Sequence, residues 1–161
     1  MQIRKARLTD IPAITEIYNE AVLTTTATFD TEVKSDEERR VWFENHGERH
    51  PIIVVEYEQK IAAWGSLSAW SPRAAYDNTV ESSLYVKSEF RGKGIGRALQ
   101  NALIELATEI GHHTLLAQIT TENEVSIALH EKTGFRTVGV LQQVGKKFGR
   151  QLDVAILQRL L

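Results

Sequence analysis

The sequence predicts one domain of the α/β or α+β class, in which helices flank a mostly antiparallel sheet. Its length of 161 residues suits one domain and leaves no room for a second domain of full size. A hydrophobic fraction of 42% is that of a chain that buries a core, which excludes wholesale disorder. Stretches with the period of strands alternate with stretches of helical period, and no repeat or flexible linker divides residues 1–161.

Strands are predicted where apolar residues alternate or run continuously between polar turns. These stretches are residues 2–6, 52–55, 61–68, 80–86, 114–120, 135–144 and 152–157. Helices are predicted where apolar residues keep helical spacing or follow a capping signal. These stretches are residues 11–22, 35–43, 99–110 and 123–132.

Local signals indicate where these helices begin. Residues 9–12 place a capping oxygen before a proline, which suits the first turn of a helix. Ser35 and Glu38 form a capping box for the second helix, and Asn123 or the residue before it caps the last. Between the first two helices, the threonine-rich stretch 24–30 favours a loop or an extended segment, because β-branched residues lose rotamer freedom in helices.

Composition and charge exclude several functional classes. Lys and Arg number 19 against 21 Asp and Glu, so a net charge of −2 gives no general basic surface for nucleic acid or an anionic membrane. The absence of cysteine excludes disulfides, Cys-type zinc sites and thiol nucleophiles. No secretory signal is visible, and no apolar run approaches the ~20 residues of a membrane span. We therefore expect a cytoplasmic protein that binds neither nucleic acid nor membranes.

The most informative segment is the glycine-rich loop 91–96, RGKGIG, which joins a strand to a long amphipathic helix. Its glycines let the backbone approach a large anion with several N–H groups pointing inward, and the helix adds its positive end. The spacing fits neither the dinucleotide pattern GxGxxG nor the phosphate loop of nucleoside triphosphatases. A flexible basic surface turn is the alternative to a diphosphate site. The residues expected to bind the diphosphate are Arg91, Gly92, Lys93, Gly94, Ile95, Gly96 and Arg97.

This loop resembles the acyl-CoA pyrophosphate loop of the GNAT superfamily of N-acetyltransferases, whose pattern is Arg/Gln-x-x-Gly-x-Gly/Ala. Residues 123–135, NEVSIALHEKTGF, resemble the family's helix beside the pantetheine arm. Residues 28–30, 73–76, 79–86 and 153–161 are similar to the phosphinothricin acetyltransferase branch. The resemblance covers nearly the whole chain. It implies a mixed sheet that is splayed at its centre, with acetyl-CoA in the cleft.

The branch acts on small amino acids with a polar side chain, such as phosphinothricin, methionine sulfoximine and methionine sulfone. The resemblance therefore implies an N-acetyltransferase that moves an acetyl group from acetyl-CoA to the α-amine of such an amino acid. It also implies a homodimer, because the branch is commonly dimeric. Asn123 and Ser126 are expected beside the pantetheine arm, although Asn123 also suits a simple helix cap.

Acetyl transfer to an amine needs a base for the amine proton and a donor for the developing oxyanion. Glu81 is the candidate base, because burial in a strand of apolar and hydroxyl residues would raise its pKa. A surface glutamate on an edge strand is the alternative, and both direct contact and relay through a water are open. The expected oxyanion donor is a main-chain N–H near Val86.

His130 occupies the position at which many superfamily members carry a tyrosine acid for the thiolate. An acid role, a packed histidine and a reaction without any acid are all open.

Three further residues are candidates for the acceptor pocket. Arg73 can bind a carboxylate or phosphinate through two parallel hydrogen bonds, with a solvated loop charge as the alternative. Tyr76 is a second contact, and Phe29 is expected to form an apolar wall. No histidine and carboxylate pattern indicates a metal site.

Other functions remain open from the sequence. The acceptor could be an aminosugar, a polyamine or a protein N-terminus, although the charge of Arg73 argues against a polyamine. A non-catalytic acyl-CoA-binding module would keep the loop at 91–96 but would not need a carboxylate at Glu81. The sequence does not decide between detoxification, such as antibiotic or herbicide resistance, and a metabolic role.

Overall fold

The computed structural model describes residues 1–161 and contains a seven-stranded sheet with the order β1-β2-β3-β4-β5-β7-β6. Its strands are β1 (Gln2–Lys5), β2 (Ile52–Tyr57), β3 (Lys60–Ala69), β4 (Thr79–Val86), β5 (Thr114–Thr120), β6 (Arg136–Lys147) and β7 (Arg150–Leu160). Its α-helices are α1 (Ile11–Thr24), α2 (Asp36–Glu44), α3 (Ile95–Ile110) and α4 (Glu124–Lys132). The predicted order and type of these elements are confirmed.

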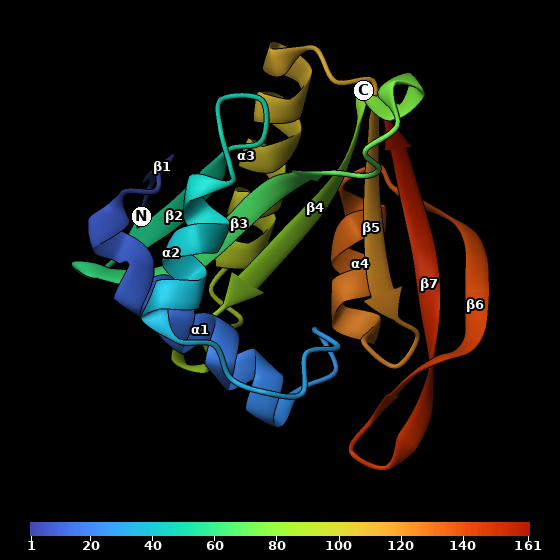
Figure 1. Cartoon of the computed structure of the whole chain (residues 1–161), viewed down its shortest axis with the longest axis horizontal. Helices are drawn as coiled ribbons and strands as arrows, with labels where there is room; N and C mark the ends of the chain where they lie inside the picture. The colour runs from blue at the N-terminus through green and yellow to red at the C-terminus, as the bar shows by residue number, and fades with distance from the viewer.

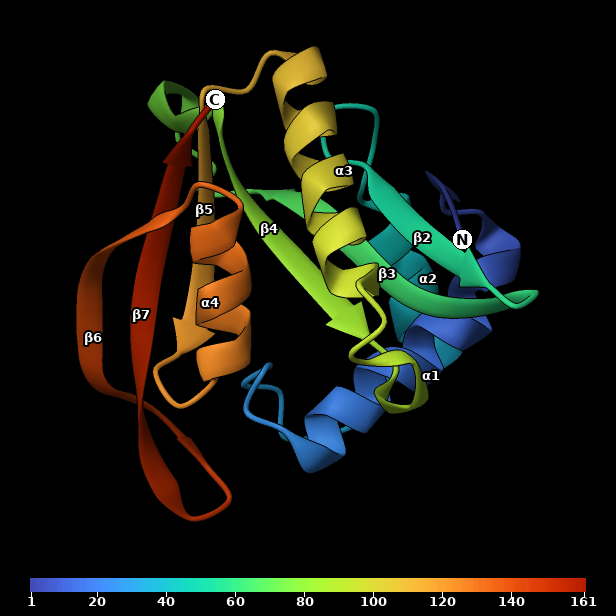
Figure 2. The ribbon, with the colours of Figure 1, turned by 180° about the vertical axis from the view of Figure 1, so that it is seen from behind.

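The sheet separates the helices into two layers. Helices α1 and α2 cover one face, whereas α3 and α4 cover the other (Figures 1 and 2). A core of 18 buried residues, including Leu99 and Leu103 of α3, fills the second layer, and a smaller core around Trp64 fills the first. Helix α3 packs so closely on β3 that a Cβ at Gly65 would lie 2.9 Å from Leu103 Cδ1. None of the helices combines the length and apolar character that a membrane crossing requires.

Strands β4 and β5 are the one parallel pair of the sheet, and they pair over only three residues. The pairs are Thr79 with Thr114, Val80 with Leu115 and Glu81 with Leu116. Beyond Glu81 the two strands separate (Figure 1). All other neighbouring strands are antiparallel. The expected mixed, mostly antiparallel sheet with a splayed centre is therefore confirmed.

The hairpin formed by β6 and β7 is longer than the sequence predicts. Its strands run to Lys147 and from Arg150, whereas the apolar pattern places the ends near residues 144 and 152. The pairing shifts register between Leu141 and Gly145, and Gln143 has a positive φ of 51°. This bulge breaks the two-residue period, so the strand cannot be followed through it from the sequence.

Candidate active site

The separation of β4 and β5 opens a cleft of about 910 Å³. Its walls come from both strands, the glycine-rich loop, α4, the segment after α1 and the hairpin of β6 and β7. A volume of this size is typical of a small-molecule site. Most of the predicted site residues line it, namely Phe29, Glu81, Val86, Arg91, Gly92, Gly94, Ile95, Gly96, Asn123, Ser126 and His130.

The glycine-rich loop has the backbone that an anion site needs. Gly92 and Gly94 have positive φ angles of 76° and 79°, which glycine adopts without steric cost. Gly94 is the N-cap of α3, no side chain caps this helix, and its first turn holds no acidic residue. A Cβ at either glycine would meet no atom within 4 Å. The N–H groups at the start of α3 therefore lack a side-chain partner, and the space beside both glycines is empty, which fits a diphosphate of a coenzyme.

The three predicted cations of this loop differ in position. Arg91 lines the cleft, and its Nε donates to the carbonyl of Val86 at 3.1 Å. Its Nη2 lies 3.4 Å from Oε1 of Glu20 on α1. Lys93 and Arg97 do not line the cleft. Lys93 instead places its Nζ 5.2 Å from the centre of the Phe90 ring, so a role for it in binding stays a prediction.

The backbone of β4 turns unpaired N–H groups toward the cleft. Lys87 N donates to the carbonyl of Ala62, and Trp70 N donates to the carbonyl of Thr79, so the odd-numbered residues of β4 pair with β3. The N–H groups of Leu84 and Val86 point away from β3, toward the edge of β4 that no longer pairs with β5. This geometry supports the predicted oxyanion donor at Val86.

Glu81 lies at the last pair between β4 and β5, and it is half-buried at the base of the cleft. Gln118 of β5 places its Nε2 3.2 Å from each Glu81 carboxylate oxygen. Burial raises the pKa of the Glu81 carboxyl, and the hydrogen bond from Gln118 opposes this rise. A carboxylate with a raised pKa in a cleft suits a general base.

His130 of α4 is buried and lines the same cleft. Its Nδ1 lies 2.8 Å from the carbonyl oxygen of Ser126. A carbonyl can only accept, so Nδ1 carries the proton and Nε2 of the neutral ring is a free acceptor. Burial lowers the pKa of the His130 imidazole, which favours this neutral form. Donation of a proton to a thiolate would require the imidazolium.

Asn123 caps α4 as the sequence predicts. Its Oδ1 accepts a hydrogen bond from Ser126 N at 3.2 Å. Both residues also line the cleft, so the cap does not exclude contact with a pantetheine arm.

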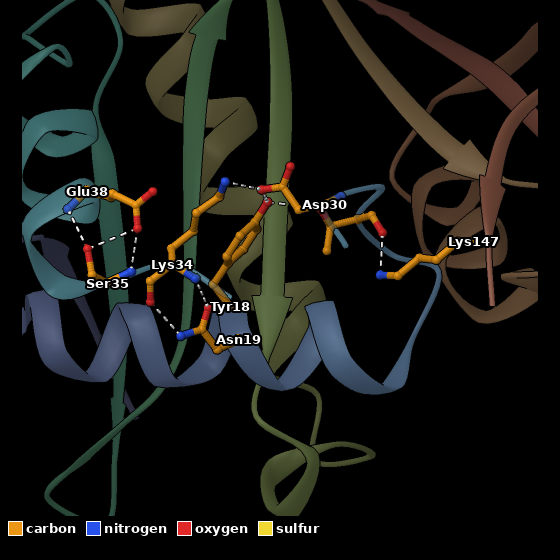
Figure 3. Close-up of polar contacts among 8 residues, drawn as sticks. Tyr18, Asn19, Asp30, Lys34, Ser35, Glu38 and Lys147 are labelled. Atoms are coloured by element: carbon orange, nitrogen blue, oxygen red, sulfur yellow. Dashed lines mark hydrogen bonds and ion pairs between the residues drawn. The ribbon is translucent and has the colours of Figure 1, made fainter. Parts of the chain in front are cut away.

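The segment after α1 closes one end of the cleft and is held by several polar contacts (Figure 3). Tyr18 donates to Oδ2 of Asp30 at 2.6 Å, and its hydroxyl lies 2.9 Å from that of Thr28. Lys147 of β6 donates to the carbonyl of Thr28 at 2.8 Å. These contacts fix Phe29, which lines the cleft. Its role as an apolar wall for the acceptor stays a prediction.

Sequence reasoning missed the residues that the hairpin contributes to this end of the cleft. Arg150 donates to both carboxylate oxygens of Glu122, at 2.8 and 3.1 Å. The apolar residues from the hairpin are Leu141, Val144, Phe148 and Val154. Three of these, Leu141, Val144 and Phe148, have large exposed fractions. This exposure is visible only in the structure, so the sequence carries no signal that places them in the cleft. Gln118 was missed as well, because the sequence carries no signal for the pairing of β4 with β5 or for its register.

Arg73 and Tyr76 lie outside the cleft of their own chain. They belong to the loop between β3 and β4, and both side chains are exposed. This loop precedes β4. The pairing of β4 with β5 ends at Glu81, and the two strands separate toward the other end of β4 (Figure 1), where the residues from Glu81 to Val86 line the cleft. A substrate contact from these two residues stays a prediction, and it requires a second copy of the chain to bring them to a cleft.

Comparisons with known proteins agree with this geometry. Residues 3–156 match the Acetyltransferase (GNAT) domain family. The L-methionine sulfoximine/L-methionine sulfone acetyltransferase of Pseudomonas aeruginosa is 39% identical over 158 residues, which cover 97% of this chain and 92% of that protein.

Solved structures show the same similarity. The ribosomal-protein-alanine N-acetyltransferase from Brucella melitensis is 41% identical, with a TM-score of 0.98 and 100% of both chains covered. A GNAT superfamily phosphinothricin acetyltransferase from Sinorhizobium meliloti, in complex with acetyl-CoA, is 37% identical with a TM-score of 0.96. That alignment covers 99% of this chain and 88% of the other.

Proposed function

Because the chain belongs to the GNAT family of acetyltransferases and is an N-acetyltransferase, we propose that its acceptor is the α-amine of a small polar amino acid. Phosphinothricin, methionine sulfoximine and methionine sulfone represent this class. The names of the relatives from Pseudomonas aeruginosa and Sinorhizobium meliloti support this class of acceptor. The observation that carries the chemistry is the position of Glu81, a half-buried carboxylate in the same cleft as the diphosphate-binding loop.

Acetyl-CoA supplies the activated acetyl group as a thioester. The N–H groups at Gly92, Gly94 and the first turn of α3 hold its diphosphate, and Arg91 adds a positive charge. Asn123 and Ser126, at the start of α4, lie beside its pantetheine arm. These assignments fit the open, uncapped start of α3.

Glu81 takes a proton from the ammonium group of the acceptor, directly or through one water, and so frees the amine lone pair. The amine then attacks the thioester carbonyl and a C–N bond forms. The C–S bond breaks as the thiolate leaves, and the second proton lost from the nitrogen passes through solvent to that thiolate, so that the products are the amide and the free thiol. The N–H of Val86 donates to the carbonyl oxygen while negative charge develops on it. His130 remains neutral and offers Nε2 as an acceptor in the same cleft.

The acceptor lies on the side of the cleft formed by Phe29 and the hairpin. The apolar side chains there exclude water from the amine and contact the methylene groups of the amino acid. We further propose a cytoplasmic homodimer, in which Arg73 and Tyr76 of one protomer approach the cleft of the other. This arrangement gives the exposed loop between β3 and β4 a route to the substrate.

A thiol-release assay with acetyl-CoA tests the proposed acceptor. We expect turnover with methionine sulfone and phosphinothricin, and only background with spermidine or glucosamine. Absence of turnover on every free amino acid would refute the acceptor class and leave the family assignment intact. Calorimetry with coenzyme A tests the diphosphate site separately, and a G94A variant shows whether the loop is the site of binding.

A protein N-terminus is the second candidate acceptor. The structure from Brucella melitensis, whose name refers to the alanine of a ribosomal protein, favours it. A peptide that begins with alanine should compete with methionine sulfone if both enter the same cleft. Higher kcat/KM for the peptide than for every free amino acid would select this second function.

A further inference from the structure

A hydrogen bond crosses the cleft where β4 and β5 separate. Gln118 lies on β5, two residues beyond Leu116, which pairs with Glu81 in the last pair between the two strands. Its Nε2 is 3.2 Å from both Oε1 and Oε2 of Glu81. A carboxylate can only accept hydrogen bonds, so in this arrangement the amide nitrogen of Gln118 donates to it.

We propose that Gln118 is a positioning residue for the reaction, because it holds the Glu81 carboxylate across the diverging strands and favours its ionised, proton-accepting form. This inference rests on the proposed function, in which Glu81 is the base. It assigns a task to a residue that the acyl-transfer chemistry does not otherwise use.

The surroundings of Glu81 leave this task to Gln118. Burial and the Gln118 hydrogen bond are the two influences on the pKa of Glu81, and no charged side chain adds to them. On β3, the cross-strand partner is Ser68, whose hydroxyl lies 3.3 Å from Nε2 of His46. On β4 itself, the titratable neighbour on the same face is Tyr85, which is packed with Trp64. The other ionisable groups that line the cleft are Arg91, Glu122, His130 and Arg150.

The hydrogen bond from Gln118 affects the position of the Glu81 carboxylate as well as its ionisation. Pairing between β4 and β5 ends at Glu81, so the backbone no longer links the strands beyond this point. Gln118 restores one link by a side chain and restricts the rotamers of Glu81. A base must lie within hydrogen-bond reach of the proton it removes, so a fixed carboxylate gives a higher kcat than a mobile one.

The test compares three substitutions that change this bond in different ways. Q118L removes the donor, Q118E adds a second negative charge, and Q118K adds a positive charge. The readouts are the pH profile of kcat/KM and the midpoint of the Glu81 carboxyl resonance in a ¹³C-labelled protein, assigned by its loss in E81Q. The resonance is measured without substrates, so it does not depend on activity.

We expect Q118L and Q118E to move the Glu81 midpoint and the acidic limb to higher pH by about one unit, and Q118K to move both to lower pH. At pH values below the acidic limb of its kcat/KM profile, Q118L should then show about tenfold lower kcat/KM than the unchanged protein. At high pH the two profiles should converge. Q151L is the matched control, because Gln151 is exposed on β7 and does not line the cleft. It should leave both readouts unchanged.

The outcomes separate this inference from the proposed function. If E81Q keeps the acidic limb, Glu81 is not the base and both fall. If E81Q loses the limb while Q118L, Q118E and Q118K leave the Glu81 midpoint unmoved, only the role of Gln118 is overturned. Q118A removes the same donor and takes the place of Q118L in both comparisons if Q118L fails to fold, because opposite shifts in Q118E and Q118K would follow from any charge placed beside Glu81.

Discussion

Phe29 lies against Gly145 with no space between them for a side chain. A Cβ built on Gly145 would overlap the Phe29 ring at Cε2. The contact joins the segment after α1 to the bulged part of β6, and it sets how far the ring of Phe29 enters the cleft. The bulge therefore has a consequence for the acceptor end of the site.

A G145A substitution should displace the Phe29 ring. Because Phe29 is 39% exposed, the ring can move away, and the loss of stability should stay near 1 kcal/mol. We expect the KM for the amino acid to rise on the order of tenfold, with the KM for acetyl-CoA unchanged. Steady-state kinetics with each substrate varied in turn measures both. In the F29A background, G145A should have no added effect. Equal effects of G145A in both backgrounds would refute this contact as the cause.

An E81Q substitution should lower kcat by about 10²- to 10⁴-fold at neutral pH. The deficit should shrink as pH rises, because the free amine then exists without a base. Since the folded protein raises the pKa of this carboxyl, ionisation of Glu81 costs stability at neutral pH. E81Q should thus melt at the same temperature as the unchanged protein or higher. A lower Tm would contradict the destabilising ionisation of Glu81.

The elements of this fold could be predicted because each carries a local signal. The capping box of Ser35 and Glu38 begins α2, and Asn123 caps α4 through Ser126. Relations between distant segments carry no such signal. The three-residue pairing of β4 with β5 decides that Gln118 meets Glu81, and this depends on the register of strands more than 30 residues apart. The acceptor end of the cleft depends in the same way on the bulge in β6.

The loop between β3 and β4 shows a different limit. Arg73 has the chemistry to bind a carboxylate, and sequence reasoning placed it in the acceptor pocket for that reason. Chemistry alone does not say where a loop lies, and in the structure this one precedes the strand that ends at the cleft. Mixed dimers of R73A and E81Q chains test a contact between protomers. Activity above that of either parent would show that Arg73 acts in the cleft of its partner.

Substitution of Gly94 should weaken coenzyme binding. Its φ of 79° lies in the left-handed region, where an alanine costs about 1–2 kcal/mol. We expect G94A to raise the Kd for coenzyme A at least several-fold, because the start of α3 would reorganise. G139A is the matched control, since Gly139 has an ordinary φ and open space around it. Isothermal calorimetry measures both, and equal Kd values for G94A and G139A would place the coenzyme elsewhere.

His130 should make the protein less stable as pH falls. Burial lowers its pKa in the folded state below the ordinary value near 6.5, so the unfolded chain binds the proton more tightly. Its contribution is fully present above pH ~6.5 and is lost as pH falls from there toward the lower folded value. In H130N, an amide nitrogen can still donate to the carbonyl of Ser126 but cannot titrate, so the fall in Tm between pH 7 and 5 should be smaller.

His46 and His50 also have lowered pKa values, and their contribution remains in both proteins. If H130N and the unchanged protein lose the same Tm over this range, His130 is not neutral by virtue of burial, and a cationic acid role for the thiolate becomes the better account.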